Sequence, residues 1–256
     1  MSRELEVRWE GLLPASPEVV WEAMTARADG YLWPIEYEPR VGGAERGLTS
    51  GGGTVTVWEP ARRFATRTRP ETERDGFNEL NYELIPHGGG ATTYLRYVHR
   101  AMLADEGFDA QLAACRAHTT FYIHSLGEYA AHFAGRTPVY VSCEGPEETA
   151  GSGGAAFAAV RRALGLADDV VPGDPVTLTP SGMDPMAGVV DYATDAFLGI
   201  RTADALYRVY GRDRWGSPIG VAHHLFAAGA DGPAATAAWG AWLDEVCAGI
   251  GAEAVA

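Results

Sequence analysis

One histidine in the first half of the chain has both the residue type and the spacing that proton transfer requires. Thr92 to Arg100 alternates as a strand does, so successive side chains point to opposite faces. Arg96 and Arg100 share the face that we expect to be in solvent, which leaves Tyr97 and His99 facing inward. His99 is the best candidate for acid–base catalysis, because imidazole titrates near neutral pH and a tyrosine shares its face. A hydrogen-bonded structural histidine is the commoner case, and both interpretations stay open.

The three cysteines, Cys115, Cys143 and Cys247, lie far apart and form no Cys-x-x-Cys pair. Zinc sites need clustered ligands and disulfide frameworks need paired cysteines, so we expect no metal, no disulfide and no cofactor. Cys115 could act as a nucleophile, but the sequence places no base beside it, and an inert buried thiol is the favoured interpretation. Four further histidines are expected at the surface: His87, His118, His124 and His132.

Strand and turn signals follow one another from residue 4 to residue 102. Glu4 to Leu13 alternates apolar with polar residues and is typical of a strand. Ser16-Pro17-Glu18 predicts the start of a short helix, because serine is a good N-cap and proline suits the first helical position. Further strands are expected at 54–58 and 64–69, and a hairpin pairs 79–84 with 92–100 around a run of glycines.

The clearest helix begins at Asp105 and ends near Gly135, with Pro138 beyond it. Its apolar residues recur at spacings of four and three and form one stripe along the helix. This stripe and the inward strand face should enclose a cavity with apolar walls and a few polar groups, as small-molecule sites do. A filled core is the commoner alternative for the aliphatic members. The expected ligand-binding residues are Phe64, Tyr82, Leu95, Tyr97, His99, Leu112, Cys115, Thr119 and Tyr122, with Leu80 on the same face.

After Gly135 the order of elements repeats in weaker form. A strand at 138–143, a helix at 155–166, five strands between 176 and 226 and a helix from Pro233 are expected. Of the adjacent His223 and His224, only one can face inward. We therefore expect two domains, residues 1–135 and a divergent second copy at 138–256.

Composition and charge exclude several classes of protein. The hydrophobic fraction of 46% and charged fraction of 21% are those of a globular protein with an ample core. The net charge of −14 argues against nucleic-acid binding, which needs a basic patch. No apolar run is long enough for a membrane span and no signal peptide is evident, so the expected location is the cytoplasm.

Three segments carry a resemblance to a known family. They are Pro17-Glu18-Val19-Val20-Trp21-Glu22-Ala23, Trp58-Glu59-Pro60-Ala61-Arg62-Arg63-Phe64 and the hairpin from Tyr82 to Leu95. With the element order, residues 3–134 resemble the helix-grip fold of the START-like (SRPBCC) superfamily, in the branch similar to the activator of the heat-shock-ninety ATPase. The resemblance implies an α+β fold in which an antiparallel sheet wraps around a long C-terminal helix, with an elongated cavity between them. The second half lacks these segments, so its likeness rests on element order.

The resemblance implies a function only in outline, because this fold serves many. The favoured hypothesis is binding of a small hydrophobic or aromatic ligand between the sheet and the long helix, with a co-chaperone-like role as one form of it. The alternative is an enzyme of the polyketide cyclase or dehydratase type. The expected partner is a small hydrophobic molecule. The small residues of the last helix favour close packing of the second copy, either on the first copy or on a second chain in a homodimer.

Overall fold

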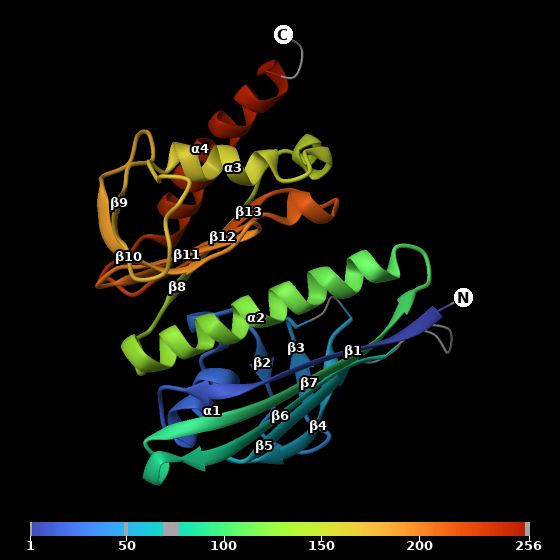
Figure 1. Ribbon diagram of the computed structural model, residues 1–256. Coiled ribbons are helices and arrows are strands. Elements are labelled where there is room, and N and C mark those ends of the chain that lie inside the picture. The colour runs from blue at the N-terminus through green and yellow to red at the C-terminus, as the bar shows by residue number, and fades with distance from the viewer. Residues whose placement is uncertain (1, 49–50, 69–76, 254–256) are drawn as a thin grey trace. The chain divides into compact units, whose positions relative to one another are not determined.

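The computed structural model describes residues 2–48, 51–68 and 77–253. The chain divides into two compact units, Met1–Gly135 and Arg136–Ala256, called here the first and the second unit. Each contains one antiparallel sheet and helices of its own (Figure 1), so the expected α+β class is confirmed. The domain limits expected at residues 1 and 256, and the strand end expected at residue 69, lie outside the described residues.

The sheet of the first unit is held together by the pairing of its first strand with its last. β1 (Ser2–Leu13) runs antiparallel to β7 (Thr92–Ala104) along its whole length. From β7 the chain order reads backwards across the sheet, which gives the order β1-β7-β6-β5-β4-β3-β2. The remaining strands are β6 (Asn78–His87), β5 (Arg63–Thr68), β4 (Gly53–Glu59), β3 (Ala44–Arg46) and β2 (Glu36–Tyr37).

The hairpin between β6 and β7 sets the register of the inward face. Gly88, Gly89 and Gly90 all have positive φ values, between 57° and 89°, which only glycine adopts without strain. The resulting register places Tyr82 opposite Tyr97, and Leu80 opposite His99. These four side chains therefore lie next to one another on the face that meets the long helix, as the alternation predicts.

Two helices complete the first unit. α1 (Pro17–Thr25) begins as predicted, with the Ser16 hydroxyl accepting a hydrogen bond from the Val19 amide at 3.4 Å. α2 (Phe108–His132) is the long helix, and it runs along the sheet (Figure 1). It begins three residues after Asp105, because Gly107 precedes it with a φ of 71° that is incompatible with the helix.

Close contact between a glycine and a tyrosine fixes the far end of α2. Gly30 ends a short 3-10 turn, Ala28–Gly30, and lies directly against the ring of Tyr129, which is almost completely buried. A β-carbon at Gly30 would overlap the ring carbons of Tyr129, so any larger residue would displace the helix or the turn.

The second unit has the same strand order as the first with one strand fewer. Its first strand, β8 (Val139–Glu144), pairs with its last, β13 (Gly220–Leu225), and the order is β8-β13-β12-β11-β10-β9. The remaining elements are β9 (Pro175–Leu178), β10 (Met186–Ala193), β11 (Phe197–Arg201), β12 (Ala205–Tyr210), α3 (Ala155–Ala163) and α4 (Gly232–Glu253). Both helices begin as predicted, near residue 155 and at the Pro233 signal, and α3 ends earlier than expected.

A buried carboxylate organises the start of α3. Asp213 lies in the 3-10 turn Arg212–Trp215 and is 1% exposed. Its Oδ2 accepts hydrogen bonds from the Ser152 hydroxyl at 2.6 Å and from the backbone amides of Gly154, Ala156 and Phe157 at 3.0–3.4 Å. The first amides of a helix have no partner inside the helix, and this side chain accepts from them together with the Ser152 hydroxyl, which accepts from the Ala156 amide at 3.1 Å.

The core of the second unit is filled mainly by aliphatic and tryptophan side chains. Trp239, Trp242 and Leu243 of α4 are buried against residues of the sheet and of α3. His223 faces this core, with its ring centroid 4.3 Å from that of Trp239, and His224 lies on the opposite face of β13. The two side chains therefore point to opposite faces, as the alternation predicts, and both are buried. Among the described residues, no helix combines the length and apolarity needed to cross a membrane.

Candidate functional site

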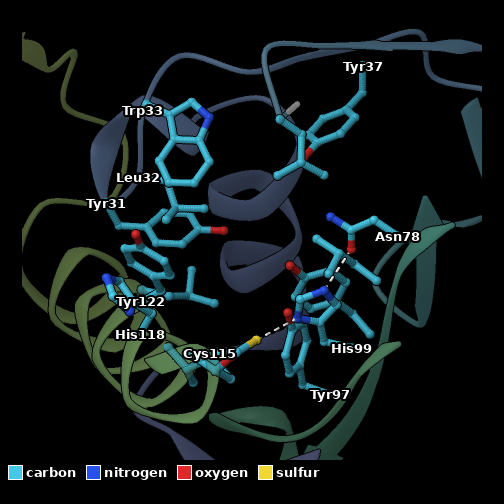
Figure 2. A pocket seen from close by; sticks show the side chains of 16 residues that line it. Tyr31, Leu32, Trp33, Tyr37, Asn78, Tyr97, His99, Cys115, His118 and Tyr122 are labelled. Atoms are coloured by element: carbon cyan, nitrogen blue, oxygen red, sulfur yellow. Dashed lines mark hydrogen bonds between the residues drawn. The ribbon is translucent and has the colours of Figure 1, made fainter. Parts of the chain in front are cut away.

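A cavity of about 180 Å³ lies in the first unit between the inward face of the sheet and α2. Three parts of the chain form its walls: the segment that follows the Ala28–Gly30 turn, strands β6 and β7, and one side of α2 (Figure 2). The lining residues are Tyr31, Leu32, Trp33, Tyr37, Leu48, Asn78, Leu80, Tyr82, Tyr97, His99, Cys115, His118, Thr119, Tyr122, Ile123 and Leu126.

Six of the nine ligand-binding residues predicted from the sequence line this cavity, namely Tyr82, Tyr97, His99, Cys115, Thr119 and Tyr122. Phe64, Leu95 and Leu112 do not. Phe64 lies behind Tyr82, with ring centroids 5.9 Å apart. Leu95 is fully buried one step further along the inward face of β7, and Leu112 packs near the start of α2 in a separate apolar cluster. The inward face is therefore longer than the cavity that it bounds.

Several lining residues were missed from the sequence. Asn78 continues the alternation of Leu80 and Tyr82 by one more step. A strand that begins one residue earlier than the expected 79–84 would predict that Asn78 faces inward. Tyr31, Leu32 and Trp33 form a conspicuous aromatic run, but without a strand or helix to place them their direction could not be inferred. Tyr37 lies in β2 and Leu48 lies two residues after β3, and both strands are too short to produce a periodic signal.

His118 corrects an expectation. The sequence predicts a surface position for it, yet it lines the cavity, with its ring centroid 5.8 Å from that of Tyr122. Its Nδ1 lies 2.8 Å from the Ala114 carbonyl oxygen, so Nδ1 carries the proton and donates it. The apolar stripe marked only the centre of the helix face that meets the cavity, and His118 lies beside it. His87 and His132 are exposed as expected, and His124 is half-buried.

Cys115, His99 and Asn78 form a connected row across the cavity wall. The Sγ of Cys115 lies 3.2 Å from Nδ1 of His99, and Nε2 of the same ring lies 2.7 Å from Oδ1 of Asn78 (Figure 2). α2 supplies the thiol, β7 the imidazole and β6 the amide. The sequence places no base beside Cys115, and it is the fold that brings His99 to it from sixteen residues away.

The two contacts of His99 fix its tautomer. An amide oxygen can only accept, so Nε2 must carry the proton that it donates to Asn78. Nδ1 of the neutral ring is then an acceptor, and the hydrogen bond to Cys115 is donated by the thiol. Asn78 is held in turn by its backbone, whose N–H donates to the Thr68 hydroxyl at 2.9 Å.

Hydroxyl groups continue this row on the other side of Cys115. The Thr119 side chain hydrogen-bonds both Cys115 and Tyr97, and Tyr97 hydrogen-bonds Tyr82. The rings of Tyr82 and Tyr97 lie 4.8 Å apart between centroids. Polar atoms in the wall therefore form one chain of hydrogen bonds, and the surface around them is aromatic and aliphatic.

The electrostatics of the site favour neutral groups. Burial raises the pKa of the Cys115 thiol and raises the pKa of the Tyr97 hydroxyl well above its usual value. Burial also lowers the pKa of His99 from 6.5 to about 4, because the charged imidazolium is poorly solvated there. The described lining contains no carboxylate and no guanidinium to offset this. At neutral pH the thiol, the imidazole and the phenols are therefore all uncharged.

The low pKa of His99 gives a testable dependence on pH. The unfolded chain takes up this proton near pH 6.5 while the folded protein does so only near pH 4, so stability falls as the pH drops through that window. We expect the loss to be about 3 kcal/mol, absent in His99→Gln. The direct measurement is the NMR titration of the His99 ring protons, assigned by their disappearance in His99→Gln. A midpoint near that of a free imidazole would contradict a desolvated ring.

The described residues contain no group of three or more His, Cys, Asp or Glu side chains that could hold a metal ion. The site can instead enclose a neutral molecule, stack aromatic rings against it and offer it hydroxyl and imidazole groups. Trp33 and Tyr122, whose rings meet edge to face at 5.7 Å, lie on one side of the cavity, and Tyr97 lies on another (Figure 2).

Comparison with solved structures gives matches to about half of the chain. CalU16 from Micromonospora echinospora is 18% identical, with 51% of this chain and 87% of that chain covered and a TM-score of 0.39. Protein MLL2253 from Mesorhizobium loti is 19% identical, with coverages of 48% and 94% and a TM-score of 0.40. Protein SA2116 from Staphylococcus aureus is 15% identical, with coverages of 51% and 93% and a TM-score of 0.40. No curated protein matches the chain.

The family assignment rests on the sequence of the first unit. Residues 14–131 match the model of the family described as Activator of Hsp90 ATPase homolog 1-like protein. This segment runs from the turn before α1 to the last turn of α2, and so it includes every residue that lines the cavity. The helix-grip arrangement and the family expected from the three sequence segments are both confirmed. Residues 14–131 belong to the Activator of Hsp90 ATPase homolog 1-like family, within the START-like superfamily.

Proposed function

We propose that the first unit binds a small, neutral, aromatic molecule in the cavity between its sheet and α2. The observation that carries this proposal is the composition of the wall. Aromatic side chains enter from the Tyr31–Trp33 segment, from β6 and β7, and from α2, and no charged side chain accompanies them among the described lining residues. Aromatic surfaces attract a flat ring by edge and face contacts, and a low-dielectric wall excludes a charged ligand.

The size of the cavity limits the ligand. Sites for drug-sized molecules typically enclose about 300–1,000 Å³. The volume of about 180 Å³ therefore suits one ring with a short chain attached, or two small rings. The hydroxyls of Tyr97 and Thr119 and the ring of His99 would orient one polar atom of such a ligand, such as a carbonyl oxygen.

Calorimetric titration with 4-phenylbutan-2-one, a neutral aromatic ketone, tests this proposal. Leu80→Trp places an indole in the cavity and should abolish binding, because Leu80 is buried and lines the wall. Asn81→Trp is the matched control, since Asn81 is the next residue of β6 and faces the other side of the sheet. Circular dichroism should show both variants folded. Equal binding by the two variants would place the ligand elsewhere and defeat the proposal.

The same protein should be examined by native mass spectrometry as purified, because an apolar ligand can remain bound during purification. A co-purifying small molecule, absent from Leu80→Trp and present in Asn81→Trp, is the expected result.

A cyclase or dehydratase would use the same cavity, and the neutral His99 ring in its wall is the observation that favours this second function.

A further inference from the structure

We propose that Cys115, His99 and Asn78 act as nucleophile, base and positioning residue in the addition of the thiol to an aryl-substituted α,β-unsaturated ketone. The proposal rests on the proposed binding of a neutral aromatic molecule and adds a covalent step to it. The bond formed joins Sγ of Cys115 to the β-carbon of the ligand.

The geometry supplies the parts that a thiol nucleophile requires. An activated nucleophile lies within hydrogen-bonding distance of a base, and a third group orients that base. Here the thiol donates to Nδ1 of His99 at 3.2 Å, and Nε2–H of His99 donates to Oδ1 of Asn78 at 2.7 Å. Three separate elements bring these side chains together at the wall of a cavity that a ligand can occupy. A structural thiol needs neither an oriented base nor a cavity.

The position of Cys115 in the helix selects the class of substrate. Cys115 lies well inside α2, so the backbone amides around it are hydrogen-bonded within the helix and cannot form an oxyanion hole beside the attacked carbon. Esters and thioesters would need such donors, and also a protonated leaving group and a water molecule. A conjugated ketone develops its negative charge on an oxygen three bonds from the attacked carbon, and the Tyr97 hydroxyl in the same cavity wall can donate a hydrogen bond to it.

The step balances without any further reactant. As Sγ attacks the β-carbon, the thiol proton passes to Nδ1 of His99 and the electrons of the carbon–carbon double bond move onto the ketone oxygen as an enolate. The enolate accepts hydrogen bonds from the Tyr97 or Thr119 hydroxyl. The α-carbon then takes the proton from Nδ1, which restores the neutral ring. S–H has been added across the double bond, nothing is oxidised and no group leaves, and the reverse sequence releases the ligand.

The rate should be nearly independent of pH over the neutral range. His99 takes up a proton only near pH 4, and burial raises the pKa of the Cys115 thiol. Between these limits the pair therefore keeps one protonation state, a neutral thiol beside a neutral imidazole. The titratable groups that face it are Tyr31 and Tyr37 from the segment after α1, Tyr82 from β6, Tyr97 from β7, and His118 and Tyr122 from α2. Arg116, which is next to Cys115 on the helix and lies outside the lining, is the charged group that acts on the thiol, and it lowers the pKa of Cys115.

The chain contains its own control. Cys143 of β8 is half-buried like Cys115, and its thiol donates to the backbone carbonyl oxygen of Thr236 at 3.3 Å. A carbonyl oxygen cannot remove the proton, so Cys143 must react through the small fraction of free thiolate. That fraction rises tenfold with each unit of pH below the thiol pKa, which burial raises here as well.

The experiment follows adduct formation with benzylideneacetone by intact mass and peptide mapping, from about pH 5 to pH 8. We expect Cys115 to react at least about tenfold faster than Cys143 at neutral pH, with a flat profile. His99→Gln should slow Cys115 about 100-fold, restore a rate that rises with pH and leave Cys143 unchanged. Asn78→Ala should slow Cys115 in the same direction, and Asn78→Asp, which keeps the acceptor, should recover the rate. Cys115→Ser should leave Cys143 as the main site.

Titration with 4-phenylbutan-2-one, which has the same skeleton without the double bond, separates failure of this inference from failure of the binding function. If the saturated ketone binds but Cys115 reacts no faster than Cys143, or with the same pH slope, the covalent step is refuted and binding stands. If the saturated ketone does not bind, the proposed binding function is wrong. Reaction with acrylamide then tests whether the Cys115 thiol is activated by His99. As a conjugate acceptor without an aromatic ring, acrylamide should still react faster at Cys115, and equal rates at the two cysteines would overturn the inference.

Discussion

Phe64→Ala is expected to lower the free energy of unfolding of the first unit by about 3–5 kcal/mol. Phe64 is 2% exposed, and its ring meets four others edge to face or tilted. The centroid distances are 4.9 Å to Tyr37, 5.6 Å to Trp58, 5.9 Å to Tyr82 and 6.0 Å to Trp21. The variant would lose this packing and leave a cavity that rigid rings cannot close.

Pulsed hydrogen exchange in a denaturant series, read by mass spectrometry, measures this loss, because separate peptides report the two units. Leu12→Ala is the control: Leu12 is 54% exposed on β1, and its truncation should change stability by no more than about 0.5 kcal/mol. Binding of 4-phenylbutan-2-one should weaken in Phe64→Ala because Tyr82 loses the ring that supports it. A loss of binding with no loss of stability would instead show that Phe64 contacts the ligand directly.

Asp213→Ala is expected to destabilise the second unit by about 2–4 kcal/mol. One carboxylate oxygen accepts hydrogen bonds from the Ser152 hydroxyl and from three backbone amides at the start of α3. Alanine would remove the buried acceptor of the Gly154 and Phe157 amides, while the Ala156 amide keeps the Ser152 hydroxyl as an acceptor at 3.1 Å. The loss of a buried acceptor costs more than the loss of an exposed hydrogen bond. Hydrogen exchange should accelerate first in peptides that cover α3.

Asp231→Ala provides the comparison for a cap in solvent. Asp231 is exposed and accepts one hydrogen bond, from the Ala234 amide at 3.0 Å, at the start of α4. We expect a loss of about 1 kcal/mol or less, because water can replace the carboxylate there. If the two substitutions cost the same, burial and the number of hydrogen bonds at Asp213 do not determine its contribution.

The architecture of the first unit could be predicted because each signal in it is local. Alternation along β1 and β7, the Ser16-Pro17 start of α1 and the glycines of the hairpin each depend on neighbours in sequence. The arm of β2 and β3 was not predicted, because strands of two and three residues are too short to show a period. The helices α2 and α3 proved shorter than their patterns, since caps and not periodicity set their ends.

The candidate site was predictable in part for a related reason. Period two placed Tyr97 and His99 on one face, and the helical stripe placed Cys115 and Thr119 on another. The sequence could not reveal the contact between His99 and Cys115, because it depends on how far α2 is shifted along β7 and on the rotation of the helix. Such displacements are determined by packing over many residues, and no short pattern encodes them.

The contact of Gly30 with Tyr129 bears on that rotation. Residues seven apart on a helix differ in direction by only about 20°, so Tyr129, Tyr122 and Cys115 follow nearly one line along α2. The phenol ring fits where Gly30 has no side chain, and a turn of α2 about its own axis would drive the ring out of that space. Gly30 therefore fixes the rotation of the whole helix about its axis. In that rotation the Cys115 thiol, fourteen residues before Tyr129, points at the His99 imidazole.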